Sequence, residues 1–558
     1  MIYTVAVPIA CTFLSYVVFH CARTLFRTWT SSLRFIDGPP SPSFVFGHSV
    51  VYSDVPETGD QWRERYGQTF MAKGIFGADD LHTTNVKAVA HILRHGSLYP
   101  RTPEFLSILT HIFGAGLLSV DLDPHRRQRK IIHPAFSAQQ IRLMNEGFLE
   151  QAIVLRDFLA ADVRKAGGSA TVNLGEMFRQ VTLDIIGEAG FGYKFNSLQS
   201  GGKNEGDLSE AFRLLFHVPS ANLNNAVQIA QGAIPVLRFL PLPGWRSMQF
   251  AKKTMKAVGT NLMQKAKAEA QALGEKELGS GRDLLSILVK ANMSADIPNT
   301  QRLSDSEIIA QVPTFLAAGH ETSSAALGWA VHVLSHHPAV QDKLRKEMLS
   351  IPTDTPTMDE LNALPFFEAV LREILRLYAP LAFIQRVATR DDVLPLNKPY
   401  VDQLGVAHET LPCISFTVFQ SPVPLTNNSI TKGQMITIPI RGINTDKEIW
   451  GEDALEFKPE RWNNLPDAVG SVPAVWGNQL TFLAGAHSCI GFRFSLVEQK
   501  AILFSLLQVF EFLPGTEPVG SVISAQLRRP SSFVSDGKGG RVSMGGLSLV
   551  VKAYQESS

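Results

Sequence analysis

One cysteine stands in a glycine-containing segment that could hold a metal ion. Cys489 lies between Gly485 and Gly491, and a segment with strongly helical composition follows it. Metals bind the thiolate form of cysteine, and the free N–H groups at the start of a helix favour that anion. The glycines would let the loop pass close to a flat ring. Phe482 could pack behind such a ring, and His487 could reach a carboxylate at its edge. Because a lone cysteine is usually an inert buried residue, this segment alone leaves both interpretations open.

A second group of reactive side chains lies inside a long predicted helix. Ser304 and Glu307 have the spacing of a capping box, which predicts that the helix begins there. Farther along, Gly319 would let a flat ligand approach, and the adjacent Glu321 and Thr322 combine an acid with a hydroxyl. Such polar groups are costly in an apolar helix unless they have partners. They are either a pair that delivers protons, or a surface glutamate beside a threonine that bends the helix.

Two more predicted helices carry charged residues at regular spacing. In one of them, Glu373 and Arg376 are three positions apart, so they share a face and can form an ion pair. In the other, a dense basic cluster, His125 and Arg129 are four positions apart and also share a face. This cluster is a solvated basic face, a clamp for an anionic cofactor group, or a docking face for an acidic partner.

Four motifs follow one another in a characteristic order. They are Ala318-Gly319-His320-Glu321-Thr322-Ser323, Glu373-Ile374-Leu375-Arg376, Pro459-Glu460-Arg461-Trp462 and Phe482-x-x-Gly485-x-His487-x-Cys489-x-Gly491. With these motifs the chain resembles the cytochrome P450 family over residues 35–555. The resemblance implies that family's fold, which is mainly α with small β-sheets (α+β), with a long central helix over the haem.

The resemblance also implies a cofactor, haem b (iron protoporphyrin IX), and the residues that hold it. Cys489 would be the axial ligand of the iron. Arg461 would join the Glu373–Arg376 pair in a structural network. The residues that would surround the ring or bind its propionates are His125, Arg129, Arg386, Phe482, Gly485, His487 and Gly491.

Two of these residues depart from the family pattern. His487 stands where the family usually has an arginine, and His125 stands where it often has a tryptophan. Both resemble the residues of some fungal, basidiomycete-like members. Because histidine is fully charged only below its pKa, we expect haem retention to depend on pH more than is usual.

The implied activity is that of a monooxygenase, with Thr322 and Glu321 delivering protons during oxygen activation. Electrons would come from NADPH through a separate cytochrome P450 reductase, with cytochrome b5 as a second candidate donor. The substrate would be a lipophilic small molecule of secondary, terpenoid-like metabolism, and a fatty-acid or xenobiotic hydroxylase is the alternative. A haem-thiolate isomerase or dehydratase that needs no O2, or a haem-binding sensor, is disfavoured because Glu321 and Thr322 are both present.

The N-terminal segment is predicted to be a membrane anchor. Residues 2–22 are mostly apolar and contain no Asp, Glu, Lys or Arg, and Arg23, Arg27 and Arg34 follow. About 20 apolar residues can span a bilayer as a helix, and positive charge favours the cytosolic side. We therefore expect a single-pass transmembrane helix in the endoplasmic reticulum membrane, with the catalytic domain in the cytosol. A signal peptide is less favoured because the basic residues follow the apolar run, and a buried helix is the other alternative.

The remaining features set the domain organisation. We expect an anchor over residues 1–23, a basic and proline-rich linker over 24–45, and a haem-thiolate monooxygenase domain over 46–558. Hydrophobic residues make up 45% of the chain and its formal charge is +1, so a large core is expected and nucleic acid is not an expected partner. An uncharged stretch over 410–428 is either a lineage-specific loop or translated intron sequence.

Overall fold

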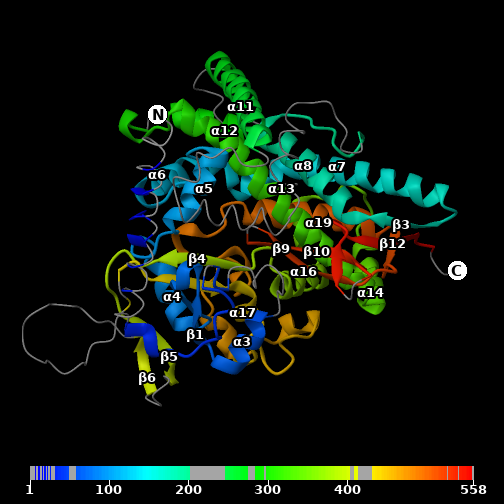
Figure 1. Cartoon of the computed structure of the whole chain (residues 1–558). Helices are drawn as coiled ribbons and strands as arrows, with labels where there is room; N and C mark the ends of the chain where they lie inside the picture. The colour runs from blue at the N-terminus through cyan, green and yellow to red at the C-terminus, as the bar shows by residue number, and fades with distance from the viewer. Residues whose placement is uncertain are drawn as a thin grey trace, which may run out of the picture.

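The computed structural model of the chain shows a helix-rich part and, below it in the view of Figure 1, a part with a sheet and short helices. The described residues are 32–44, 46–48, 58–200, 245–273, 283–294, 297–401, 407–411, 430, 432–524, 526–537 and 540–555, with isolated positions before residue 32. The expected anchor lies almost wholly outside them, as do residues 412–428 of the uncharged stretch.

Helices make up most of the described structure, as the sequence predicts. They are α3 (Thr58–Tyr66), α4 (Val86–Arg94), α5 (Pro103–Phe113), α6 (Leu122–Ile132), α7 (Ala138–Lys165), α8 (Leu174–Phe191), α11 (Trp245–Leu273), α12 (Leu284–Met293), α13 (Asp305–Ser335), α14 (Pro338–Leu349), α15 (Met358–Asn362), α16 (Pro365–Leu377), α17 (Ile440–Asn444), α18 (Lys447–Trp450) and α19 (Phe492–Leu507). Within the described residues, no helix is both long enough and apolar enough to cross a membrane.

The strands form small sheets from segments that are far apart in the sequence. They are β1 (Thr69–Lys73), β2 (Asp79–Thr83), β3 (Ser169–Asn173), β4 (Phe383–Val387), β5 (Leu394–Val401), β6 (Ala407–Leu411), β7 (Met435–Pro439), β8 (Phe510–Leu513), β9 (Val519–Ser524), β10 (Leu527–Ser535), β11 (Arg541–Ser543) and β12 (Ser548–Ala553). Their orders within the described residues are β1-β2-β7-β4, β11-β10-β9, β3-β12-β8 and β5-β6. The fold is therefore mainly α with small β-sheets.

The helix α13 runs through the middle of the molecule in Figure 1. Its start confirms the predicted capping box, since Ser304 N donates to Glu307 Oε2 at 2.9 Å and Glu307 N donates to Ser304 Oγ at 3.3 Å. The helix continues through Pro313 without a break. The main hydrophobic core includes residues of α7, α8, α13 and α19, and α13 contacts α8 and α19 directly. The candidate acid and hydroxyl therefore lie on a helix that is buried over most of its length.

Candidate active site

The loop that carries Cys489 is folded back on itself just before α19. Cys489 N donates to Phe482 O at 2.8 Å, and Ser488 N donates to Gly485 O at 3.1 Å. Gly485 has a φ of +70°, and a Cβ at this position would lie 2.2 Å from Leu93 O. Both observations require glycine, because a side chain would meet the backbone of α4.

Aromatic rings and the helix start complete this loop. Phe482 is buried and packs edge-on against Trp476, with ring centroids 5.6 Å apart. Gly491 is the N-cap of α19, which begins at Phe492 as predicted. The backbone at Gly491 also donates toward the Cys489 thiol. The loop therefore presents its sulfur at a helix N-terminus.

Cys489 is enclosed by protein and yet keeps accessible surface. The residue is exposed, although burial raises the pKa of its thiol above the ordinary value. The Gly491 N–H and the charge of Arg129 lower that pKa but do not reverse the shift. The helix start therefore favours the thiolate, as expected, but desolvation has the larger effect on the pKa.

The accessible positions in the middle of α13 form one short strip. Between Ala310 and Val331, every residue is buried except Ala318, Gly319 and Thr322. Ala318 and Thr322 are four residues apart and share a face, and Thr322 Oγ1 donates to Ala318 O at 2.6 Å. The Thr322 oxygen can still accept a hydrogen bond on this face.

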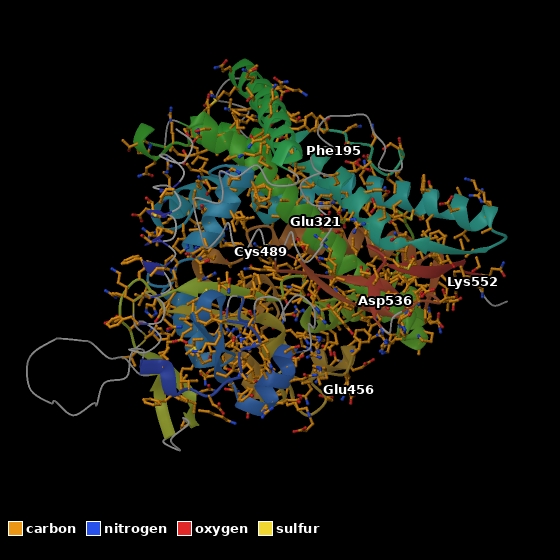
Figure 2. All side chains as sticks on the ribbon, in the orientation of Figure 1. Phe195, Glu321, Glu456, Cys489, Asp536 and Lys552 are labelled. Atoms are coloured by element: carbon orange, nitrogen blue, oxygen red, sulfur yellow. The ribbon has the colours of Figure 1, made fainter. Side chains whose placement is uncertain are left out.

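This strip and the cysteine loop belong to segments that meet. Ser323, the neighbour of Thr322, has its Oγ 3.2 Å from Ser495 Oγ on α19, six residues after Cys489. Figure 2 shows Cys489 and Glu321 near the middle of the molecule in this view. The predicted ligand and the predicted proton-delivery pair are therefore joined by the contact between α13 and α19.

The structure corrects one expectation about α13. A Cβ on Gly319 would lie 3.1 Å from Ile186 Cγ1 of α8. The missing side chain therefore allows close packing of two helices, and the approach of a flat ligand at Gly319 stays a prediction. Glu321 is buried, with 4% of its surface exposed, so its interpretation as a surface glutamate is wrong.

Three arginines gather near the cysteine loop around one carboxylate. Arg101 and Arg386 are buried, and burial lowers the pKa of each guanidinium to about 10. Arg129 donates to Ser488 O at 2.8 Å and to Ser488 Oγ at 3.1 Å, so it reaches the loop itself. The carboxylate that offsets their charge is Asp121. This cluster therefore has more positive than negative charge, which an anionic ligand would balance.

Two histidines complete the cluster. His487 Nε2 lies 2.7 Å from Asp121 Oδ1, and its ring centroid is 4.6 Å from that of His125. Burial and nearby arginines lower the pKa of His487 despite its bond to Asp121, and burial, Arg101 and His487 lower the pKa of His125 to about 3. Both imidazoles are therefore mainly neutral near pH 7. The pH dependence of haem retention stays a prediction, and it is expected at a pH below 7.

A cavity of about 320 Å³ lies beside this cluster. Its lining includes the loop residues Ala486 and His487, and the α6 residues His125, Arg129 and Lys130. The basic helix predicted from the sequence therefore has one face turned to the cysteine loop.

The predicted structural network is confirmed and is larger than expected. Arg376 binds Glu373 with two bonds of 2.7 and 2.8 Å, and Arg461 Nε donates to Glu373 Oε1 at 3.1 Å. Trp462 Nε1 adds a bond of 3.1 Å to Glu373 Oε2. Arg461 Nη1 also donates to Asp453 Oδ1. The bonds from Lys458 and Arg461 lower the pKa of Asp453 to about 2.

Arg376 also fixes a loop that comes later in the chain. Its Nη1 donates to Asn444 O at 2.8 Å and to Ala454 O at 2.6 Å, and its Nη2 donates to Glu456 O at 3.3 Å. Glu456 is labelled in Figure 2. Because Glu373 and Arg376 are both fully buried, this network holds α16 rigidly against the segment that leads to the cysteine loop.

These residues fit a haem. The accessible thiol of Cys489 would hold the iron, and the loop at Gly485 has no room for a side chain. The surplus positive charge around Asp121 would bind two propionates, with Arg101, Arg129 and Arg386 as donors. In the described structure, His487 already has a carboxylate partner in Asp121, so its predicted bond to a propionate stays a prediction.

Three residues of the site were not predicted from the sequence. Asp121 precedes α6 and accepts from Leu122 N at 2.7 Å, so the N-cap signal could have revealed it as a cap. No local signal could have paired it with His487. Arg101 and Arg529 lie in segments whose spacing suggests no function, and only tertiary contacts bring them to the site.

Comparison with known proteins agrees with this geometry. The chain matches the family model described as Cytochrome P450 over residues 38–396 and 408–533. It is 41% identical over 509 residues to cytochrome P450 monooxygenase 128 of Postia placenta, an alignment that covers 90% of each chain. It is 34% identical over 535 residues to a ganoderic acid synthetase of Ganoderma lucidum, with 91% of this chain and 92% of the relative covered.

A third relative, a cytochrome P450 monooxygenase of Ampulloclitocybe clavipes, is 31% identical over 516 residues, which cover 91% of this chain and 90% of the relative. The fold and site define a haem-thiolate protein. The chain belongs to the cytochrome P450 family, and its relatives are fungal monooxygenases.

Proposed function

We propose that this enzyme inserts one oxygen atom of O2 into a lipophilic small molecule, with electrons from NADPH that a separate reductase supplies. The observation that carries the proposal is the accessible strip of Ala318 and Thr322 on the otherwise buried middle of α13. The residue after Thr322, Ser323, contacts α19, the helix that follows Cys489. Haem, when bound through a thiolate, supplies the electron donation that favours O–O cleavage. Every other role falls to side chains of the chain itself.

The proton-handling residues are Thr322 and Glu321. Thr322 Oγ1 donates to Ala318 O, which leaves its oxygen free to accept from a water or from another proton donor on the accessible face. Glu321, directly before it, is a buried carboxylate that can take up and release a proton. Together they deliver protons where oxygen is activated and limit the loss of peroxide.

The substrate class and the cellular setting belong to the same proposal. One relative is named for ganoderic acid synthesis, which supports secondary, terpenoid-like metabolism for this chain as well. The apolar residues 2–22, with arginines after them, support an anchor in the endoplasmic reticulum membrane and contact with membrane lipid. NADPH–cytochrome P450 reductase is the proposed electron donor, with cytochrome b5 as an additional one.

The proton role is tested with Thr322→Ala. We expect normal haem content, with product per NADPH reduced by about tenfold and hydrogen peroxide increased. Thr314→Ala is the matched control, because Thr314 Oγ1 makes the same bond to a carbonyl four residues earlier and its residue is buried. Unchanged coupling in Thr322→Ala would refute the role.

The substrate class is tested by expression with a reductase in yeast microsomes. A panel of terpenoids, fatty acids and xenobiotics is screened by binding spectra, and products are identified by mass. A product one oxygen atom heavier, formed only with O2 and NADPH, is expected from a terpenoid. Turnover that needs neither O2 nor NADPH would identify an isomerase or dehydratase instead.

A further inference from the structure

An arginine on β10 makes the closest charged contact of the candidate proton-relay acid. Arg529 Nη2 lies 2.7 Å from Glu321 Oε2, and the two side chains are 26% and 5% exposed. In the described part of the chain, Glu321 is the one carboxylate within ion-pair distance of Arg529. The C-terminal sheet therefore supplies a counter-charge to the central helix.

Backbone bonds hold the start of β10 in place. Ala382 N donates to Gln526 O at 2.9 Å, and Arg528 N donates to Pro380 O at 2.7 Å. The segment around Pro380 follows α16, which carries the buried Glu373–Arg376 pair. These bonds fix the strand directly before Arg529.

Close packing also fixes β10 against α13. A Cβ on Gly328 would lie 2.9 Å from Pro530 Cγ, so the absence of a side chain lets the strand approach the helix. Gly328 is seven residues after Glu321, which places both on one face of α13. Trp329 Nε1 adds a bond of 3.4 Å to Arg528 O. This face meets Arg529 at Glu321 and Pro530 at Gly328.

The charge environment makes Arg529 dependent on Glu321. Burial lowers the pKa of Arg529, Glu321 raises it, and the nearby Arg179 lowers it. Arg179 has its own partner in Glu176. Arg529 Nε has no hydrogen-bond partner among the described residues. A partly buried guanidinium in this position is stabilised chiefly by its one carboxylate.

We propose that Arg529 is a positioning residue for proton delivery, which holds the Glu321 carboxylate against β10 and orients it for transfer toward Thr322. The proposal rests on the proposed function, because it acts through Glu321. In each transfer the carboxylate takes one proton from water, releases one proton toward Thr322, and returns to the ion pair. The arginine itself exchanges no proton.

The test compares Arg529→Gln, Arg529→Lys, Glu321→Gln and the double variant Glu321→Gln with Arg529→Gln, all as haem-loaded full-length proteins with reductase. The substrate is the panel compound with the highest turnover. Arg529→Gln should lower product per NADPH by about tenfold, and Arg529→Lys should restore most of it. The double variant should form as much product per NADPH as Glu321→Gln, because both substitutions disrupt the same ion pair.

A matched control and a second measurement keep the result specific. Arg541→Gln removes the same charge from an exposed position on β11 of the same sheet, and it should leave coupling unchanged. Thermal unfolding of the purified proteins gives a readout without turnover. The losses in Tm from Glu321→Gln and Arg529→Gln should not add in the double variant.

The outcomes separate this inference from the proposed function. If Glu321→Gln uncouples the enzyme but Arg529→Gln does not, or if the two effects multiply, the role of Arg529 is refuted and that of Glu321 stands. If Glu321→Gln leaves coupling unchanged, the relay itself fails. Additive losses in Tm would also overturn the inference, because they would show that the two side chains act independently.

Discussion

Glu498 on α19 is a fully buried carboxyl group whose two oxygens have no well-aligned hydrogen bond within the described structure. Burial raises its pKa from 4.5 to about 8, and the Ser323 hydroxyl lowers it only in part. The folded chain therefore keeps a proton on Glu498 that the unfolded chain releases above its ordinary pKa.

This difference predicts a pH-dependent stability. Because the pKa of Glu498 is raised in the folded chain, its contribution to the free energy of unfolding is fully present below about pH 4.5. This contribution is lost as pH rises toward about 8, at about 1.4 kcal/mol per pH unit. Glu498→Gln should remove this dependence on pH. Urea unfolding at about pH 5.5 and about pH 7.5 measures it: between the two pH values, the unchanged protein should lose about 2.7 kcal/mol more stability than Glu498→Gln.

Glu452→Gln is the control for that measurement, because the Glu452 side chain is 92% exposed. It should keep the slope of the unchanged protein. An equal slope in Glu498→Gln would show that Glu498 is ionised in the fold.

A second prediction about single residues concerns the Glu373–Arg376 pair. Arg376→Lys loses the two-point bond to Glu373 and most of the bonds to Asn444 O, Ala454 O and Glu456 O. Glu373 keeps Arg461 and Trp462 as partners, but the lost bonds leave buried carbonyl oxygens without a donor, at a cost of about 1–3 kcal/mol each. We therefore expect a low yield of haem-loaded protein and a large loss in urea midpoint.

Arg372→Lys serves as its comparison. Arg372 lies on the same helix and pairs with Glu368, but it is partly exposed, with a side-chain exposure of 34%. Its replacement should cost no more than about 1 kcal/mol. Similar losses in the two variants would contradict the special role of the buried pair.

Among the helices, α6 and α13 are joined by a buried amide network. Gln311 on α13 accepts from Leu117 N at 3.0 Å and donates to Gln128 Oε1 on α6 at 3.1 Å. Gln128 donates in turn to Ala115 O at 2.8 Å and to Glu307 Oε1 at 3.2 Å. The helix that carries Arg129 is thus tied to the helix that carries Glu321 and Thr322.

Gln311→Leu should therefore loosen this tie. It removes the acceptor of Leu117 N and the donor to Gln128 Oε1, and each buried unsatisfied group costs about 1–3 kcal/mol. Urea unfolding should show a loss of about 2–4 kcal/mol, whereas Gln301→Leu at an exposed position should change stability by less than about 0.5 kcal/mol. A loss below about 1 kcal/mol in Gln311→Leu would refute the network's importance.

The elements also show what the sequence could predict. Capping signals located the start of α13 at Ser304, and a spacing of three located the Glu373–Arg376 pair, because both depend on neighbours within one helix. The contacts of Glu321 with Arg529, and of His487 with Asp121, join segments hundreds of residues apart. Local patterns carry no information about such contacts, so neither was predicted.

For the same reason, the neighbour of Gly319 was not predicted. A glycine signals close approach, but only the packing of α8 shows that Ile186 is the neighbour. The sheets show this limit most clearly, since β2 pairs in parallel with β7 and β4 pairs with β7 from the other side. No local pattern identifies β2 and β4 as the partners of β7.

In the whole molecule, two frameworks meet at the haem site. The buried network around Glu373 fixes the approach to the cysteine loop, and α13 packs against both α19 and the C-terminal sheet. The cation cluster around Asp121 closes the remaining side. These features serve a common function, holding a haem, only if Cys489 binds the haem iron as a thiolate.

Carbon monoxide difference spectra of the reduced protein test that claim most directly. The unchanged protein should show the band of a thiolate-ligated haem, and Cys489→Ala should abolish it. Cys11→Ala, which removes an exposed cysteine in the N-terminal segment, should leave the band intact. A thiolate band that persists in Cys489→Ala would contradict the assignment of the ligand and, with it, the proposed function.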